Sequence, residues 1–312
     1  MNQVTNQNEI ISALQTALPS AVRWCGAVAR RLRHFDISVG GKSSGNANTD
    51  ALTLADLSVQ ELLVAALRDA DPILRQCRIQ GEETTGDMAN FAQESELAIA
   101  IDPIDGTKQY RDRTGNGYSI IVHLHNFDTP LYSLVFAPEM GPHGTWVEVT
   151  PNKIVCGPDD TSIPARQVLD KLPDMTTPRK SLGQGIYLIG FQERDTQRAR
   201  EVDGLGLMGR TSDEMQGSIY PLMATGEYAG SLIHSPNIYD FPVSMHIARV
   251  RGGDAIWAHN REPVHYRSLW MDTRAGMLRY PSIVACSEDP HILESLSQLA
   301  ESWPQDRYTP KS

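Results

Sequence analysis

Residues 101–107 read Ile-Asp-Pro-Ile-Asp-Gly-Thr, and they follow a short apolar run at 97–100 that predicts a buried strand. Two carboxylates, Asp102 and Asp105, stand three residues apart in what we expect to be a turn. The Gly and Thr that close the turn offer free backbone N–H groups. Hard cations such as Mg²⁺ prefer carboxylate and carbonyl oxygens, whereas phosphate oxygens prefer backbone N–H groups. A strand-end loop that offers both matches the needs of metal-assisted phosphoryl transfer to water.

The composition is that of a globular protein. The chain has 312 residues, of which 40% are hydrophobic and 21% charged, enough for one large domain or two intimate ones. Asp and Glu outnumber Lys and Arg by 38 to 28, which gives a net charge of −10. This acidic balance argues against a broad nucleic-acid-binding face, so we expect no nucleic acid polymer as a partner.

Cysteines and hydropathy indicate a cytoplasmic protein without a membrane partner. The chain shows no basic segment followed by a long apolar run at its beginning, and no stretch approaches the roughly 20 apolar residues of a membrane span. The cysteines form no C-x-x-C pair, so we expect free thiols and no cysteine zinc site. They are Cys25, Cys77, Cys156 and Cys286.

Helical patterns dominate the beginning of the chain. Apolar residues at steps of three and four predict a helix over 8–33, which Pro19 should kink or split. We expect residues 40–50, which contain several glycines, to form a polar loop. A second helix begins near Asp56 and ends at Asp71, which precedes a proline.

Strand patterns follow, and the two kinds of element then alternate. Residues 150–180 are rich in Pro, Asp and Thr, and we interpret them as the seam between an N-terminal and a C-terminal half. The alternation predicts a layered α/β or α+β architecture. The predicted strands are 97–101, 118–124, 131–136, 144–149 and 186–190, and the predicted helices of the second half are 213–226, 240–250 and 288–301.

Three further acidic positions accompany the stretch at 101–107. Glu82 lies in a Gly-Glu-Glu sequence before it, Asp56 lies at the start of the second helix, and Asp240 at the start of a later one. Each has an ordinary explanation when taken alone: a Glu-Glu pair in a loop is usually solvated, and an Asp at a helix start is usually an N-cap. Their joint occurrence at strand ends and helix starts favours one shared metal site.

In this combination the sequence resembles the inositol monophosphatase superfamily of Mg²⁺-dependent, lithium-sensitive phosphatases. The similarity spans about residues 8–260. It implies an α/β (α+β) fold, a five-layered αβαβα sandwich, and it allows a homodimer, since dimers are common in the family. Residues 1–155 would form an N-terminal half with most metal ligands, and residues 156–312 a C-terminal half. The matching motifs are Gly81-Glu82-Glu83, Asp102–Thr107, Tyr239-Asp240 and Gly252-Gly253.

The resemblance also implies a role for each matching residue, around two or three Mg²⁺ ions. One ion is held by Glu82, Asp102 and the carbonyl of Ile104, and a second by Asp102, Asp105 and Asp240. Glu82 also helps to hold a third, weaker ion. The catalytic group is Thr107, oriented by Asp56 so that it positions and activates the metal-bound water. The implied substrate contacts are the backbone N–H groups of Gly106 and Thr107, together with Lys42.

Two positions bear on the substrate. Inositol-specific members place a Glu seven residues before the last ligand, where this chain has Ile233, and an isoleucine cannot accept a hydrogen bond from a hydroxyl group. Glu227 and His234 are near enough in sequence to compensate. Lys108, directly after the motif, resembles the branch that hydrolyses adenosine 3′,5′-bisphosphate.

These departures favour a substrate with two phosphates. Lys108, Arg111 and Arg113 are candidate partners of the second phosphate, and a solvated basic turn is the equal alternative. We therefore expect a Mg²⁺-dependent phosphomonoesterase for which a nucleotide or sugar bisphosphate is marginally ahead of myo-inositol monophosphate. The alternative from another class is a catalytically inactive regulatory protein on the same fold.

Overall fold

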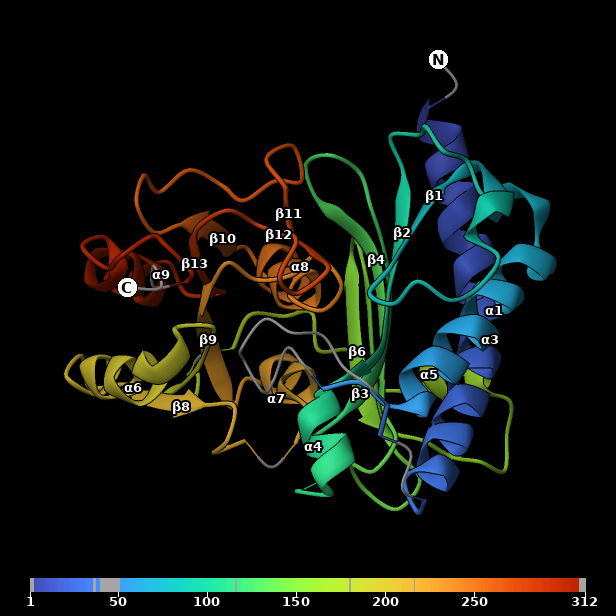
Figure 1. Ribbon diagram of the computed structural model, residues 1–312, viewed down its shortest axis with the longest axis horizontal. Helices are drawn as coiled ribbons and strands as arrows, with labels where there is room; N and C mark the ends of the chain where they lie inside the picture. Colours follow the sequence, from blue (N-terminus) through green and yellow to red (C-terminus); the bar gives the residue numbers. More distant parts are fainter. Residues whose placement is uncertain are drawn as a thin grey trace.

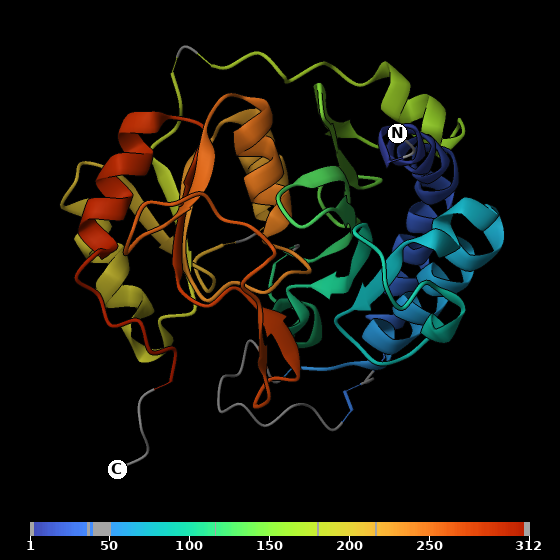
Figure 2. The same cartoon turned by 90° about the horizontal axis from the view of Figure 1, so that it is seen from above.

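The chain folds into five layers, which alternate between helices and sheets (Figure 1). The computed structural model describes residues 3–35, 38–39, 51–115, 117–179, 181–215 and 217–308, with side chains from residue 7 onward. Three separate apolar cores lie between the layers. The view from above shows the same order of helices, sheet, helices, sheet and helices (Figure 2). The predicted αβαβα sandwich is therefore confirmed.

The first layer is helical, and its longest member is α1 (Gln3–Leu32). This helix continues through Pro19, so of the predicted kink or split the split is wrong. Apolar side chains before and after the proline are buried in one core. Gly26 brings the helix close to the sheet, because a Cβ there would lie 2.5 Å from the ring of Phe136. The other helices of this layer are α3 (Leu54–Ala70) and α5 (Ala165–Lys171).

The second layer is a six-stranded sheet in the order β1-β2-β3-β4-β5-β6. Its central strands are buried on both faces, which explains their continuous apolar sequences. The four predicted strands of this half are confirmed, whereas β1 and β6 were not predicted. The strands are β1 (Arg78–Gly81), β2 (Ala98–Asp105), β3 (Ser119–His125), β4 (Pro130–Ala137), β5 (Thr145–Thr150) and β6 (Lys153–Pro158).

The expected turn at Asp102 and Asp105 is wrong, because β2 continues through both residues. Asp102 pairs with Ile121 of β3 and Asp105 with Ser119, so β2 has one residue more than its partner between the two pairs. Residues three apart in a regular strand point to opposite faces. The bulge absorbs the extra residue, and both carboxylates reach the same face of the sheet.

The third layer is a helix pair, α7 (Ile219–Thr225) and α8 (Pro242–Val250), which packs on both sheets. The fourth layer is a five-stranded sheet in the order β10-β13-β9-β7-β8. Within it β7 runs parallel to both neighbours, and the remaining pairs are antiparallel. Its strands are β7 (Gly185–Ile189), β8 (Met208–Thr211), β9 (Tyr228–His234), β10 (Asp254–Trp257) and β13 (Ile283–Ser287).

The fifth layer covers the outer face of the second sheet with α6 (Asp195–Asp203) and α9 (Pro290–Ala300). The predicted helices at 240–250 and 288–301 and the strand at 186–190 are confirmed, whereas the helix predicted over 213–226 is limited to α7. The boundary proposed between residues 155 and 156 falls within β6. Smaller elements are α4 (Thr107–Asp112), the hairpin β11 (Trp270–Asp272) and β12 (Met277–Arg279), and the 3₁₀ turns η1 (Pro72–Gln76), η2 (Met88–Asn90) and η3 (Gln192–Arg194).

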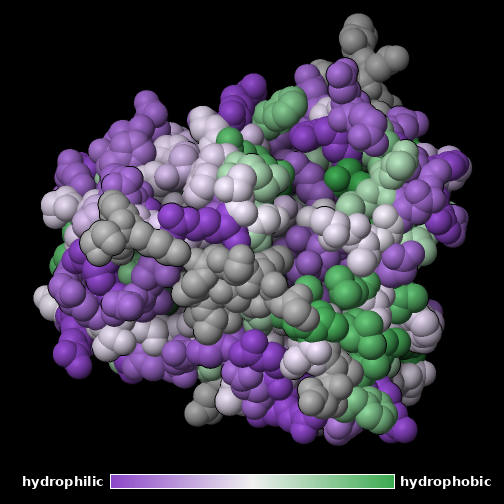
Figure 3. Space-filling model, viewed as in Figure 1, coloured by the Kyte–Doolittle hydropathy of each residue, from purple (hydrophilic) through white to green (hydrophobic). Residues whose placement is uncertain are grey.

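The surface carries apolar side chains at one end of the first layer. Figure 3 shows apolar surface at the lower right, the region where Figure 1 places α1 and α3. Trp24 and Phe35 are 58% and 57% exposed, and Leu54 at the start of α3 is 45% exposed. Exposed apolar surface is typical of contact surfaces, and the homodimer stays a prediction. All four cysteines are free and buried. None of the described helices is long and apolar enough to cross a membrane.

Candidate active site

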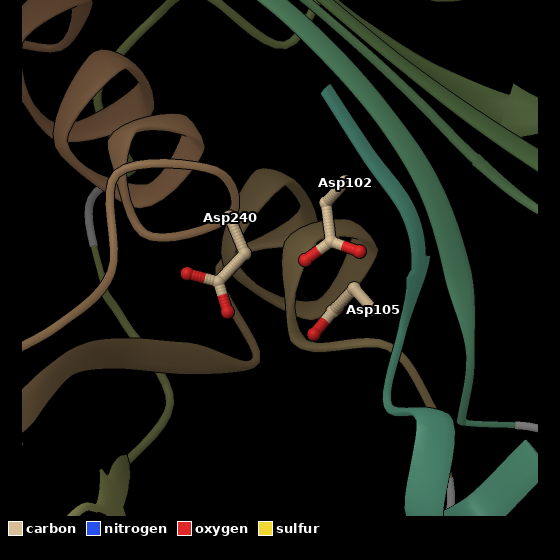
Figure 4. A group of neighbouring side chains, drawn as sticks. All are labelled: Asp102, Asp105 and Asp240. Atoms are coloured by element: carbon tan, nitrogen blue, oxygen red, sulfur yellow. The ribbon is translucent and has the colours of Figure 1, made fainter. Parts of the chain in front are cut away.

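Three carboxylates meet in a pocket between the first sheet and the second half of the chain. Asp102 and Asp105 come from the end of β2, and Asp240 faces them from the loop before α8 (Figure 4). One oxygen of each lies within 4.8 Å of the others. The site thus joins residues that stand far apart in the sequence, and the bulge in β2 brings the first two together.

A short polar turn fixes Asp240. The side-chain oxygen of Asn237 accepts hydrogen bonds from the backbone N–H groups of Tyr239, at 2.7 Å, and of Asp240, at 3.1 Å. Its own carboxylate accepts a hydrogen bond from the N–H of Phe241. Such a turn is a common use of Asn, and here it holds the third carboxylate in front of β2.

Glu82 reaches the pocket because β1 runs parallel to β2. Gly81, the last residue of β1, pairs with Ile101 of β2. The residues that follow this pair, Glu82 and Asp102, therefore lie side by side. The fully buried Gln60 of α3 holds the following turn, since its side-chain oxygen accepts a hydrogen bond from the N–H of Glu83 at 2.9 Å. Glu82 lies outside the group of three carboxylates but next to it, and its charge acts on them.

The three carboxylates resist ionisation when no cation is present. Burial raises the pKa of Asp102 and Asp105 well above the usual range, and the charges of their acidic neighbours raise it further. Burial and the charge of Glu82 raise the pKa of Asp240 to about 6. Since like charges in a dry site repel, a bound cation would stabilise the ionised forms.

The donor set fits a hard divalent cation. Asp102 is 2% exposed, and its Oδ1 atom accepts no hydrogen bond from any of the described residues. Buried carboxylate oxygens normally have a partner, and a cluster of carboxylate oxygens is the ligand type that Mg²⁺ prefers. The unpartnered oxygen therefore has the chemistry of a metal ligand.

Thr107 lies beside these carboxylates and is held by Asp56. Its hydroxyl group lies 3.0 Å from Asp56 Oδ1 and 2.8 Å from the carbonyl oxygen of Ile104. The other oxygen of Asp56 accepts hydrogen bonds from the N–H and the hydroxyl of Thr53, at 2.8 and 2.5 Å. Asp56 thus caps α3 and reaches Thr107 at the same time. Burial raises its pKa to about 7.

Gly106 shapes the turn between β2 and α4. It has a φ of +85°, in the left-handed region, and a Cβ would lie 2.9 Å from the carbonyl oxygen of Gly117. Both features require glycine at this position. The turn brings Gly106 and Thr107 to the pocket wall next to Asp105.

The predicted substrate contacts divide into those that line the pocket and those that do not. Lys108 lines it, and its Nζ atom forms an ion pair of 2.5 Å with Asp213. Ile233 lines it as a buried apolar side chain. Lys42 lies outside the described residues.

Arg111 and Arg113 do not line the pocket. The first forms an ion pair with Asp112 at 2.8 Å, and the second donates a hydrogen bond to the carbonyl of Phe35 at 3.0 Å. The alternative of a solvated turn is therefore correct for these two residues. Glu227 does not line the pocket either.

His234 does line the pocket, but its ring is occupied elsewhere. Nδ1 lies 3.0 Å from the hydroxyl of Ser235, and Nε2 lies 3.2 Å from the carbonyl oxygen of Pro304. Burial, with the nearby charge of Arg307, lowers the pKa of His234 to about 4, so the ring is neutral at pH 7. His234 therefore does not replace the carboxylate of the glutamate that is expected at position 233 for an inositol substrate.

Several residues of the pocket escaped the sequence analysis. Tyr220 lines the pocket, and both it and Ser119 of β3 hydrogen-bond to Asp105. Arg279 and Arg307 line the pocket from the last part of the chain. None of these residues belongs to a local motif, and only the tertiary fold brings them to the site.

Comparison with known proteins shows what the chain is similar to. A model of the inositol monophosphatase family matches residues 11–154, the part that carries Asp56, Glu82, Asp102 and Asp105. No curated protein matches the sequence.

Solved structures of the same fold cover nearly the whole chain. Inositol monophosphatase from Anabaena (Nostoc) sp. PCC 7120 has a TM-score of 0.61 at 16% identity, with 94% of this chain and 97% of that chain covered. CysQ from Bacteroides thetaiotaomicron, a bacterial member of the family, has a TM-score of 0.60 at 18% identity over 88% and 97%. An IMPase/NADP phosphatase complexed with NADP and Ca²⁺ has a TM-score of 0.65 at 13% identity over 95% and 97%. The inositol monophosphatase family is therefore the family that the first part of the chain is similar to, and solved members of that family share the fold of nearly the whole chain.

Proposed function

We propose that this protein is a Mg²⁺-dependent phosphomonoesterase that hydrolyses a small phosphate ester. The observation that carries the proposal is the convergence of Asp102, Asp105 and Asp240 around a buried carboxylate oxygen without a partner among the described residues. The Gly106-Thr107 turn adjoins them in the same pocket. The side chains that would bind the metal and the backbone N–H groups that would bind the phosphate are thus adjacent.

Asp102, Asp105 and Asp240 would hold the metal, with Glu82 and the carbonyl of Ile104 as further ligands. Bound Mg²⁺ lowers the pKa of a coordinated water and stabilises the leaving alkoxide. The remaining tasks of the protein are to position the ester and to orient the attacking water.

Thr107 would orient the attacking water. When its hydroxyl donates a hydrogen bond to Asp56, its lone pairs are free to accept one from water. The second oxygen of Asp56 is engaged by Thr53, which fixes the direction in which the carboxylate accepts. The backbone N–H groups of Gly106 and Thr107 would bind the phosphate oxygens.

A bisphosphate is the favoured substrate. Ile233 gives the pocket wall an apolar side chain where a hydroxyl partner is expected for inositol, and His234 is a neutral ring with both nitrogens engaged. Structural relatives are complexed with NADP and bound with D-inositol-1-phosphate, so both substrate classes occur on this fold and the preference rests on the pocket residues. A nucleotide or sugar bisphosphate is therefore ahead of myo-inositol 1-phosphate.

Parallel kinetics test the proposal. With Mg²⁺ present, we expect a kcat/KM for adenosine 3′,5′-bisphosphate or fructose 1,6-bisphosphate that exceeds that for myo-inositol 1-phosphate by roughly tenfold or more, since hydroxyl groups left without partners weaken binding. Phosphate release is measured for each ester, with Lys108→Ala as the companion variant. A best rate with inositol 1-phosphate, unchanged in Lys108→Ala, would show that the substrate assignment is wrong. No release from any ester would favour an inactive regulatory protein.

Lithium should inhibit hydrolysis at millimolar concentrations. A small monovalent ion can occupy an oxygen-lined metal position without supplying the charge of Mg²⁺. Phosphate release is followed across a LiCl series, and an NaCl series of equal ionic strength is the control. Identical curves for the two salts would place the protein outside the lithium-sensitive group.

A further inference from the structure

Two arginines from the last part of the chain line the same pocket as the carboxylates. Arg279 ends β12, and Arg307 lies in the segment that follows α9. Both are buried, with 4% and 8% of their surface exposed. They lie beyond residues 11–154, the part that the family model matches.

The two guanidinium groups share one carboxylate. Asp272 Oδ2 lies 2.8 Å from Arg279 Nε and 3.9 Å from Arg307 Nε, and it also accepts a hydrogen bond of 2.7 Å from the hydroxyl of Tyr308. Two positive charges therefore face one negative charge. The group of Arg279, Arg307 and Asp272 therefore carries a net positive charge, and it lies close enough to Asp240 for Arg279 to stabilise that carboxylate.

The arginines also retain hydrogen-bonding capacity. Arg307 Nη1 donates to the carbonyl of His234 at 2.5 Å, but its buried Nε has no hydrogen-bond partner among the described residues. Arg279 Nη2 contacts the sulfur of Met277 at 3.0 Å, and a thioether is a weak acceptor. Buried donors that lack a good acceptor are costly, and an anion in the pocket would supply one.

We propose that Arg279 and Arg307 form a second anion subsite, which binds a phosphate group of the substrate other than the one that is hydrolysed. The guanidinium fork matches the oxygens of a phosphate. The subsite deepens the proposed phosphatase function and rests on it. The sequence analysis assigned this task to Lys108, Arg111 and Arg113, of which only Lys108 lines the pocket.

The test compares ester pairs that differ only in the second phosphate: adenosine 3′,5′-bisphosphate with adenosine 3′-monophosphate, and fructose 1,6-bisphosphate with fructose 1-phosphate. Calorimetry of the full chain with Ca²⁺ in place of Mg²⁺ measures binding. We expect one bisphosphate to bind about 10- to 100-fold more tightly than its monophosphate, the range for charge-assisted hydrogen bonds. Arg307→Gln should remove this preference, and Arg307→Lys should keep part of it.

A matched variant separates binding from support of the fold. Arg198 of α6 stacks on Trp303, which lies in the same C-terminal segment as Arg307. The guanidinium carbon of Arg198 lies 4.2 Å from the ring centre, and Arg198 does not line the pocket. Arg198→Gln should therefore change the affinities for both esters of a pair by the same factor. Equal binding of both esters to the wild type, or an equal loss for both in Arg307→Gln, would overturn the subsite.

Turnover with Mg²⁺ distinguishes failure of the subsite from failure of the proposed function. Absence of phosphate release together with a preserved binding preference would refute the phosphatase and leave the anion subsite standing. Release of phosphate without any preference for a bisphosphate would refute the subsite alone.

Discussion

Replacement of Asp102 by asparagine is expected to abolish hydrolysis while the fold is retained. This carboxylate lies among Glu82, Asp105 and Asp240, and one of its oxygens has no other partner among the described residues. Loss of its charge weakens metal binding at the centre of the cluster. We expect kcat/KM to fall by at least about 1,000-fold, a loss comparable with removal of a principal electrostatic group from other active sites.

The same variant should stabilise the metal-free protein. Because the folded-state pKa of Asp102 lies above its unfolded value, the metal-free fold binds the additional proton, and its stability falls as pH rises through the folded pKa. Asparagine removes this penalty, so the Tm in EDTA should rise at pH 8 by roughly 2 °C for each kcal/mol gained, and by less at pH 5. Wild-type turnover in Asp102→Asn would mean that residues 101–107 are structural. A lowered Tm at pH 8 would contradict the repulsion argument.

The acidic site could be predicted from the sequence because its residues belong to short motifs. Asp102, Asp105 and Thr107 occur within one heptapeptide, and Asp56 begins a helix whose periodicity is clear. The conformation of the heptapeptide could not be predicted. Proline and glycine there indicated a turn, yet β2 continues as a bulged strand, and proline is tolerated in strands at bulges. The outcome depends on pairing with Ser119 and Ile121, which lie on another strand.

The elements that escaped prediction are short or lack a hydrophobic period. β1 has four residues of intermediate burial, and β6 lies in a segment whose prolines and aspartates indicated a loop. Pro19 shows the opposite case, since tertiary packing on both sides of it overrides a local helix breaker. The helix-breaking tendency of a single residue is thus outweighed where the surrounding side chains pack into a core.

The substrate side of the pocket lay beyond local sequence signals altogether. Arg279 is separated from Asp240 by α8, β10 and β11, and Arg307 also by β12, β13 and α9. They reach the pocket through the hairpin β11–β12 and the segment after α9. Arg111 and Arg113 stand next to the motif but turn toward Asp112 and Phe35. Proximity in sequence therefore indicated which carboxylates come together, but it did not indicate which basic groups line the pocket.

Removal of divalent metal by exhaustive treatment with EDTA should reduce hydrolysis to the background rate, and Mg²⁺ should restore it. One oxygen of each of the three carboxylates lies within 4.8 Å of the others, and the ionised groups repel one another. Without a cation they therefore take up protons, and no metal ion is present to neutralise the charge of the phosphate ester. Metal binding should also raise the Tm as Mg²⁺ is added, because a ligand that binds only the folded state stabilises it. The thermal shift reports metal binding independently of turnover.

The Mg²⁺ requirement should depend on pH in a defined direction. Protons must leave the carboxylates before the metal binds, and the metal-free pKa of Asp240 is about 6. The Mg²⁺ concentration for half-maximal activity should therefore rise as pH falls from 7.5 to 5.5, by about fourfold if Asp240 alone titrates and by more if Asp102 and Asp105 take part. Each pH is measured with its own Mg²⁺ series, and protein kept in Mg²⁺ throughout is the control for irreversible loss. Turnover that survives chelation, or a Mg²⁺ requirement that falls on acidification, would refute a metal site built from these three carboxylates.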